Sequence, residues 1–215
     1  MYQLEYFPIR GLGEVIRFLL EDNNIPYENK FVQKDEWSQA KKHGVESGQI
    51  PFGQLPVLKD GNLNLAQGGA IIRYLARKHA LYGENMEEQA IADMLYEAAR
   101  DLRYEYFRYI FQDNWEDQKE AFLLKAKVSL ACFEKHFQRK RTKYVASENI
   151  CFADYNLFDV LDHLHRLEKS LFVEFPHLNQ FYETMKNRPR LAAYLASDRH
   201  FAQPVFIPLG WTARG

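Results

Sequence analysis

The stretch F-G-Q-L-P-V-L-K-D-G-N-L-N-L-A-Q-G-G-A, residues 52–70, decides the fold. Its proline, Pro56, cannot donate a hydrogen bond to a sheet, so it marks the start of a strand and pushes Leu55 towards an extended conformation. The next residues predict a buried strand, a two-residue hairpin turn and an alternating return strand, in the order Val57-Leu58, Asp60-Gly61 and Asn62-Leu63-Asn64-Leu65. The sequence leaves open whether the Leu55-Pro56 bond is cis.

The end of the same stretch starts a helix. Gln67-Gly68-Gly69 is followed by the apolar run A-I-I-R-Y-L-A, residues 70–76. The first amides of a helix have no partner inside it, so they attract a carboxylate or a phosphate. Residues 52–70 therefore predict a unit that binds a small anionic peptide through its backbone.

Strand and helix patterns alternate on both sides of this unit. Tyr2–Tyr6 alternates as a short strand, residues 14–20 have the broad apolar face of a helix, and residues 27–32 form a second strand. Residues 34–48 have no clean period, and we expect a short irregular helix there. Residues 1–80 therefore predict an α/β domain with the thioredoxin-like order.

The rest of the chain carries helical patterns only. We expect helices over residues 86–113, 119–139, from Cys151 onward, 176–188 and 190–197. Asp154 is the acidic partner of a capping box at Cys151. Residues 81–215 therefore predict an all-α helical domain.

Composition excludes several classes of function. Hydrophobic residues make up 47% of the chain, as in an ordinary globular protein. The net charge is −1, so the overall charge does not favour binding to nucleic acid or to an anionic membrane. The basic run at residues 139–143 is typical of a solvated helix end. We find no signal peptide and no run of about 20 apolar residues. With only Cys132 and Cys151, no disulfide framework is implied, and we expect a cytoplasmic protein.

Three kinds of site are set aside. Gly11-Leu12-Gly13 follows a strand and opens a helix, but the third glycine of a dinucleotide fingerprint is replaced by Ile16. Thioredoxin-type redox chemistry needs a cysteine at the end of the first strand, and none is there. Without a H-E-x-x-H motif or a cysteine cluster, the sequence predicts no metal site.

A set of motifs spans the chain nearly end to end. They are Y-F-P-I-R-G (6–11), F-G-Q-L-P-V-L (52–58), L-A-Q-G-G-A-I-I-R-Y-L-A-R (65–77), L-Y-G-E-N (81–85), D-M (93–94), D-L-R (101–103), F-A-D-Y-N-L-F-D (152–159) and R-P-R-L-A-A-Y-L (188–195). Each is weak alone, but the ordered set resembles the cytosolic glutathione transferases, above all the pi class and its nematode relatives. The resemblance implies a homodimer that adds the thiolate of its co-substrate, glutathione, to hydrophobic electrophiles without a further cofactor.

The resemblance makes Tyr6 the catalytic residue. A thiol with a pKa of about 8.5 is only about 3% thiolate at pH 7, and the thiolate is the nucleophile. A phenolic hydrogen bond to the anion raises the reactive fraction. Lowering the thiol pKa by about two units corresponds to about 2.7 kcal/mol.

The resemblance also assigns the rest of the glutathione site. The Leu55 backbone would pair with the cysteinyl part, held by Pro56. The other assigned residues are Gln67 and the Gly68 amide for the γ-glutamyl carboxylate, Trp37 with Lys42 or His43 for the glycyl end, Gln54 for a polar contact, and Asp101 for the γ-glutamyl amine of the neighbouring subunit.

The remaining assignments concern the electrophile and the dimer. The electrophile pocket would be built from Phe7, Leu12, Phe111 and Phe206. Phe52 matches an aromatic key that inserts between helices of the partner near Met94 and Leu95.

Three positions depart from the family pattern. Gly68 stands where a serine is usual, so one hydroxyl contact to the carboxylate is missing, and a hydrogen bond to a charged group contributes about 1.5–3 kcal/mol. Leu12 replaces an arginine of the pi class, and Phe111 replaces a tyrosine that faces the electrophile. The predicted electrophile pocket is therefore unusually apolar.

Other functions on this fold stay open at the level of sequence. They are a glutathione-dependent isomerase or peroxidase, a non-catalytic protein that binds hydrophobic ligands, and a structural protein such as a lens crystallin. Tyr6 favours an enzyme, whereas Gly68 and Phe111 favour weakened catalysis. The identity of the electrophile cannot be read from the sequence.

Overall fold

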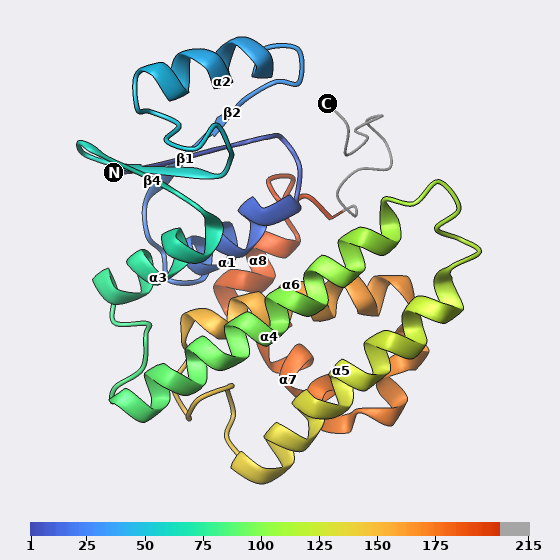
Figure 1. Ribbon diagram of the computed structural model, residues 1–215. Helices are drawn as coiled ribbons and strands as arrows, with labels where there is room; N and C mark the ends of the chain where they lie inside the picture. Colours follow the sequence, from blue (N-terminus) through green and yellow to red (C-terminus); the bar gives the residue numbers. More distant parts are fainter. Residues whose placement is uncertain (203–215) are drawn as a thin grey trace. The chain divides into compact units, whose positions relative to one another are not determined.

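A computed structural model describes residues 1–202, and its contacts divide the chain into two compact units (Figure 1). The first unit contains β1 (Tyr2–Tyr6), the 3-10 turn η1 (Gly11–Gly13), α1 (Glu14–Asp22), β2 (Tyr27–Phe31), α2 (Trp37–Glu46), β3 (Val57–Asp60), β4 (Leu63–Ala66), α3 (Gly68–Lys78) and α8 (Pro189–Leu195). The second contains α4 (Met86–Ile110), α5 (Lys119–Lys140), α6 (Phe152–Leu167), η2 (Lys169–Glu174) and α7 (Pro176–Lys186).

The first unit is built on a four-stranded mixed sheet in the order β2-β1-β3-β4. β1 pairs parallel with β2 and antiparallel with β3, where Leu4 lies opposite Leu58. Leu4, Val57 and Leu58 are almost completely buried, so the centre of the sheet is the core of this unit. Figure 1 shows α1 and α3 on one face of the sheet and α2 on the other. The predicted thioredoxin-like α/β fold is confirmed.

The hairpin turn lies one residue later than predicted. Asp60 still pairs with Leu63, so the two turn residues are Gly61 and Asn62, with φ +58° at Gly61. Asp60 stays in the strand, and its carboxylate accepts a hydrogen bond from the Tyr74 hydroxyl at 2.5 Å. The peptide bond that the sequence left open, Leu55-Pro56, is cis.

The segment expected to hold a short irregular helix forms the regular ten-residue helix α2. Gly44 is its one buried residue, and a Cβ there would lie less than 3.0 Å from the Ile50 side chain. The remainder of the helix is exposed or half-buried, so it needs no apolar stripe. That is why its sequence carries no clean helical period.

The second unit is helical, as predicted. The Asn85 side chain caps α4 by accepting a hydrogen bond from the Glu88 amide at 3.0 Å, and the helix ends at Ile110, earlier than expected. Asp154 accepts hydrogen bonds from the amides of Cys151, at 2.7 Å, and Val145, at 2.8 Å. The predicted carboxylate of the capping box is therefore in place, and it also holds the loop before α6.

The chain returns to the first unit near its end. We expected one boundary after residue 80, whereas residues 188–202 group with residues 1–79. The reason is that α8 packs against α1, and Arg188 forms an ion pair of 2.6 Å with the buried carboxylate of Asp22. Within residues 1–202, no helix combines the length and the apolar character needed to cross a membrane.

Candidate functional site

Tyr6 ends β1 and its ring is enclosed by a glycine-rich turn. The side chain is 5% exposed, and its hydroxyl oxygen accepts a hydrogen bond of 2.9 Å from the Leu12 amide. A Cβ at Gly11, where φ is +41°, would lie less than 3.0 Å from that oxygen, and a Cβ at Gly13 would lie 2.7 Å from the ring. Gly11 and Gly13, which do not complete a dinucleotide-binding motif, are therefore needed here because a larger residue at either position would clash with the Tyr6 ring.

This geometry suits the Tyr6 hydroxyl to donate a hydrogen bond. A phenolic hydroxyl can accept and donate at the same time. The bond accepted from the Leu12 amide polarises the hydroxyl and strengthens the bond that it donates to another group. An anion such as a thiolate is the acceptor that gains most from such a donor.

The start of α3 lies next to the same turn. A Cβ at Gly68 would be 4.0 Å from both the Leu12 carbonyl oxygen and the Pro56 ring. The Ala70 and Ile71 amides bond to the carbonyl of Gln67, whereas no partner among residues 1–202 is recorded for the amides of Gly68 and the glycine after it. The predicted anion-binding helix start is thus close to Leu12, whose amide contacts Tyr6.

Polar and apolar side chains complete this part of the first unit. Gln67 has φ +71°, and its side-chain amide Nε2 donates a hydrogen bond of 3.0 Å to the side-chain oxygen of Gln54. The Phe7 ring lies 5.6 Å from the Tyr6 ring and 5.3 Å from the Trp37 ring. Trp37 and Leu55 pack on one small buried cluster, formed by Ile50, Val57 and Ala66. Most of the predicted glutathione residues of the first unit therefore gather around the end of β1.

Five further predicted site residues lie on α2, in the helical unit or outside the described residues. Lys42 and His43 are exposed on α2. Asp101 is exposed on α4 of the helical unit, 3.6 Å from the Arg100 guanidinium. Phe111 follows α4, with its ring 6.3 Å from that of Phe107. Phe206 lies outside the described residues.

The residues predicted for the dimer differ in exposure. Phe52 is 69% exposed and Met94 is 54% exposed. Leu95, in contrast, is 6% exposed and belongs to the core of the helical unit. Phe52 and Met94 are therefore available to a partner, and Leu95 is not.

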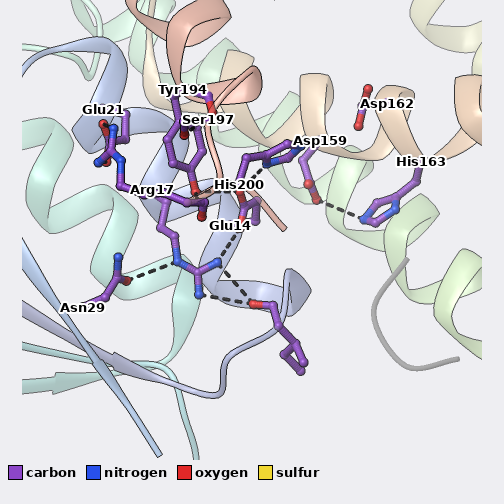
Figure 2. A network of polar contacts seen from close by, with 12 residues as sticks. Glu14, Arg17, Glu21, Asn29, Asp159, Asp162, His163, Tyr194, Ser197 and His200 are labelled. Carbon is purple, nitrogen blue, oxygen red and sulfur yellow. Dashed lines mark hydrogen bonds and ion pairs between the residues drawn. The ribbon is translucent and has the colours of Figure 1, made fainter. Parts of the chain in front are cut away.

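Sequence analysis missed a buried ionic network beside Tyr6 (Figure 2). Glu14 and Arg17, one helical turn apart on α1, form an ion pair with both side chains fully buried. The other carboxylate oxygen of Glu14 accepts hydrogen bonds from the Tyr194 hydroxyl and His200 Nδ1, each at 2.9 Å. Burial and the Glu14 carboxylate raise the pKa of Tyr194 well above its usual value, so its hydroxyl stays a donor.

Comparisons with known proteins agree with this geometry. The family model described as the glutathione S-transferase N-terminal domain matches residues 2–77, and that of the glutathione S-transferase C-terminal domain matches residues 100–198. Glutathione S-transferase P 1 of Xenopus laevis is 38% identical over 207 residues, covering 95% of this chain and 96% of the relative. Glutathione S-transferase P 10 of Caenorhabditis elegans is 41% identical over 209 residues, covering 95% and 94%.

A solved structure gives the same assignment. The pi-class glutathione S-transferase of Onchocerca volvulus superposes with a TM-score of 0.82 at 38% sequence identity, over 90% of this chain and 91% of that one. Both domain models, the curated relatives and the solved structure point to one family. The chain belongs to the glutathione S-transferase family and resembles its pi-class members.

Proposed function

We propose that the protein is an enzyme that conjugates reduced glutathione to hydrophobic electrophiles. The observation that carries this proposal is the Tyr6 hydroxyl, polarised by the Leu12 amide at 2.9 Å at the end of β1. Its role is to stabilise the thiolate of glutathione, which then attacks the electrophile. Family membership and the names of the relatives support the same reaction.

Glutathione is bound, in this proposal, by the groups around Tyr6. The Leu55 backbone pairs with the cysteinyl part of glutathione, and the Pro56 ring that follows holds the Leu55 backbone in place. Gln67 and the Gly68 amide receive the γ-glutamyl carboxylate, and Gln54 supports Gln67 through their 3.0 Å hydrogen bond. The further proposed contacts are Trp37 with Lys42 or His43 at the glycyl end, and Asp101 from the partner subunit at the γ-glutamyl amine.

The electrophile is proposed to be apolar. Phe7 packs against Tyr6, and Leu12 is half-buried beside the same hydroxyl, so the surroundings of the sulfur are aromatic and aliphatic. Phe111 and Phe206 are the other proposed contributors. Transfer of an apolar acceptor from water into such surroundings is favourable.

Turnover with a generic aromatic halide tests the proposal. At saturating glutathione, the enzyme is expected to catalyse displacement of the halide by the glutathione thiolate. The absorbance of the thioether product measures the rate. Isomerase and peroxidase assays with the same preparation test the alternative reactions. No conjugation at saturating glutathione would refute the transferase function.

Gly68→Ser is expected to tighten glutathione binding about tenfold, because the added hydroxyl gives one further hydrogen bond to the carboxylate. The site has room for it, since the nearest atoms to a Cβ are 4.0 Å away. Isothermal calorimetry measures the dissociation constant. Ala121→Ser, exposed on α5, controls for the added hydroxyl. Equal or weaker affinity in Gly68→Ser would contradict the proposed role of the helix start.

We also propose a homodimer in which Phe52 inserts beside Met94 of the partner. Two large exposed apolar side chains on one chain support such a contact. Phe52→Ser is expected to weaken the dimer by about 2 kcal/mol, or about thirtyfold, because a buried aromatic anchor is lost. Sedimentation over a range of concentrations measures the change, with Val173→Ser, also exposed, as control. An unchanged dissociation constant would exclude Phe52 from the interface.

The proposed location is the cytoplasm. Cys132 and Cys151 are both free thiols, one exposed and one buried. Free thiols persist in a reducing compartment, where reduced glutathione is also abundant.

A further inference from the structure

Arg17 lies against the ring of Tyr6. Its guanidinium carbon is 5.9 Å from the ring centroid, and a Cβ at Gly13 would contact both the Tyr6 ring and the Arg17 guanidinium. The arginine is fully buried, which is costly for a charge unless every donor is paired. A cation in this place is therefore a fixed part of the surroundings of the tyrosine.

Several acceptors hold the guanidinium in position. Beyond the ion pair with Glu14, it donates two bonds of 3.2 Å to the carbonyl oxygen of Ile9 and one of 3.2 Å to the Asn29 side chain. Ile9 follows β1, and Asn29 lies on β2. Arg17 is thus held by the loop that follows β1 and by β2, which fixes its position relative to Tyr6 at the end of β1.

The C-terminal segment, residues 194–201, holds the other end of the ion pair. Tyr194 and His200 both donate to the Glu14 oxygen that Arg17 does not use. The Phe201 ring covers the guanidinium, with 4.9 Å between its centroid and the central carbon. Figure 2 shows Tyr194 and His200 close to Glu14 and Arg17. A continuous set of contacts therefore runs from the C-terminal segment to Tyr6.

We infer that Arg17 is a positioning residue for Tyr6, that Glu14 and the C-terminal segment hold it in place, and that it strengthens the hydrogen bond from Tyr6 to the glutathione thiolate. The inference rests on the proposed transferase function. A cation over an aromatic ring is attracted to its π electrons and favours negative charge on the phenolic oxygen. The hydroxyl then becomes a stronger donor to an anion.

Arg17→Met removes the charge and keeps much of the side-chain volume. The pKa of the bound glutathione thiol, titrated by its thiolate absorbance, is expected to rise by about one unit, which is a tenfold loss of thiolate below the pKa. Arg17→Lys retains the charge and is expected to restore at least half of that shift. Arg188→Met is the matched control, because it breaks another ion pair of the same unit at Asp22 and is expected to leave the thiol pKa unchanged.

A double-mutant cycle tests whether Arg17 acts through Tyr6. In the Tyr6→Phe background, Arg17→Met is expected to leave the thiol pKa unchanged, because the hydroxyl through which it acts is gone. An equal rise in both backgrounds would show that Arg17 acts on the sulfur independently, and it would overturn the inference.

Variants of the C-terminal segment test its part in the inference. His200→Leu removes one donor to Glu14 and is expected to raise the thiol pKa by about half a unit, or about threefold in thiolate. Asp198→Asn, an exposed change in the same segment, is expected to have no effect. An identical titration in wild type and His200→Leu would overturn the role of the segment. This variant keeps both charges of the pair, so it also decides the inference if Arg17→Met does not fold.

Wild-type measurements separate this inference from the proposed function. If the wild type binds no glutathione, or leaves the thiol pKa at its free value, the proposed function fails. If the wild type lowers the thiol pKa and Arg17→Met lowers it equally, the proposed function stands and the inference fails.

Discussion

Tyr6→Phe is expected to raise the pKa of the bound glutathione thiol by about two units, which corresponds to about 2.7 kcal/mol of stabilisation of the thiolate. The substitution removes only the hydroxyl that the Leu12 amide polarises, while the ring stays between Gly11 and Gly13. For a bound thiol of pKa near 6.5, the thiolate fraction at pH 7 would fall from about three quarters to about 3%. Titration of the thiolate absorbance at saturating glutathione measures the shift.

Turnover is a less direct measure of the same change. A thiolate of higher pKa is intrinsically more nucleophilic, with a Brønsted slope of about 0.4–0.5, so part of the lost rate at pH 7 returns. Tyr2→Phe is the matched control, because it removes a phenolic hydroxyl from the same strand, where it bonds to His79 at 2.9 Å. Superimposable titrations of wild type and Tyr6→Phe would show that Tyr6 does not stabilise the thiolate.

Glu14→Ala is expected to reduce the free energy of unfolding by about 3–5 kcal/mol, because it leaves the Arg17 charge buried without its partner. Both side chains are fully buried, so water does not replace the lost contact. Tyr194 and His200 lose their shared acceptor in the same step. Urea denaturation followed by circular dichroism measures the change as a lower midpoint at unchanged slope.

A surface ion pair provides the control for Glu14→Ala. Glu174→Ala removes a carboxylate that pairs with Lys127, and both side chains are more than a third exposed. Such pairs contribute about 0–1 kcal/mol, so the midpoint is expected to move little. A loss below about 1 kcal/mol in Glu14→Ala would mean that the buried pair contributes no more than a surface pair.

Much of the fold could be predicted because local chemistry determines it. Pro56 and the alternating residues after it specify the hairpin whatever surrounds them. The exact turn could not be predicted, because Asp60 is kept in the strand by Tyr74, a contact from α3. The packing of α8 against α1 could not be predicted either, because an apolar stripe shows that a helix is covered but does not identify the element that covers it.

The candidate site divides in the same way. Tyr6, Leu55 and Gly68 lie at ends of strands and helices that the motifs locate, and the structure brings their surroundings together. Leu95 was assigned to the dimer interface with Met94, yet neighbouring helical residues point about 100° apart, which separates the exposed Met94 side chain from the buried Leu95. No pattern in the sequence indicates a role for Glu14 and Arg17, because oppositely charged residues at i,i+3 commonly pair on a helix surface and the burial of this pair depends on residues 194–201.

The packing of the C-terminal segment on the first unit also determines the order in which that unit can fold during synthesis. The ribosome delivers Glu14 and Arg17 early, but Tyr194 and His200 only after the whole helical unit has been translated. At roughly 5–20 residues per second, the roughly 180 residues from Arg17 to Tyr194 take on the order of 10–35 s. During that interval the nascent N-terminal unit lacks two of the donors to Glu14, so its last step of folding waits for Tyr194 and His200 although all four strands have been made long before.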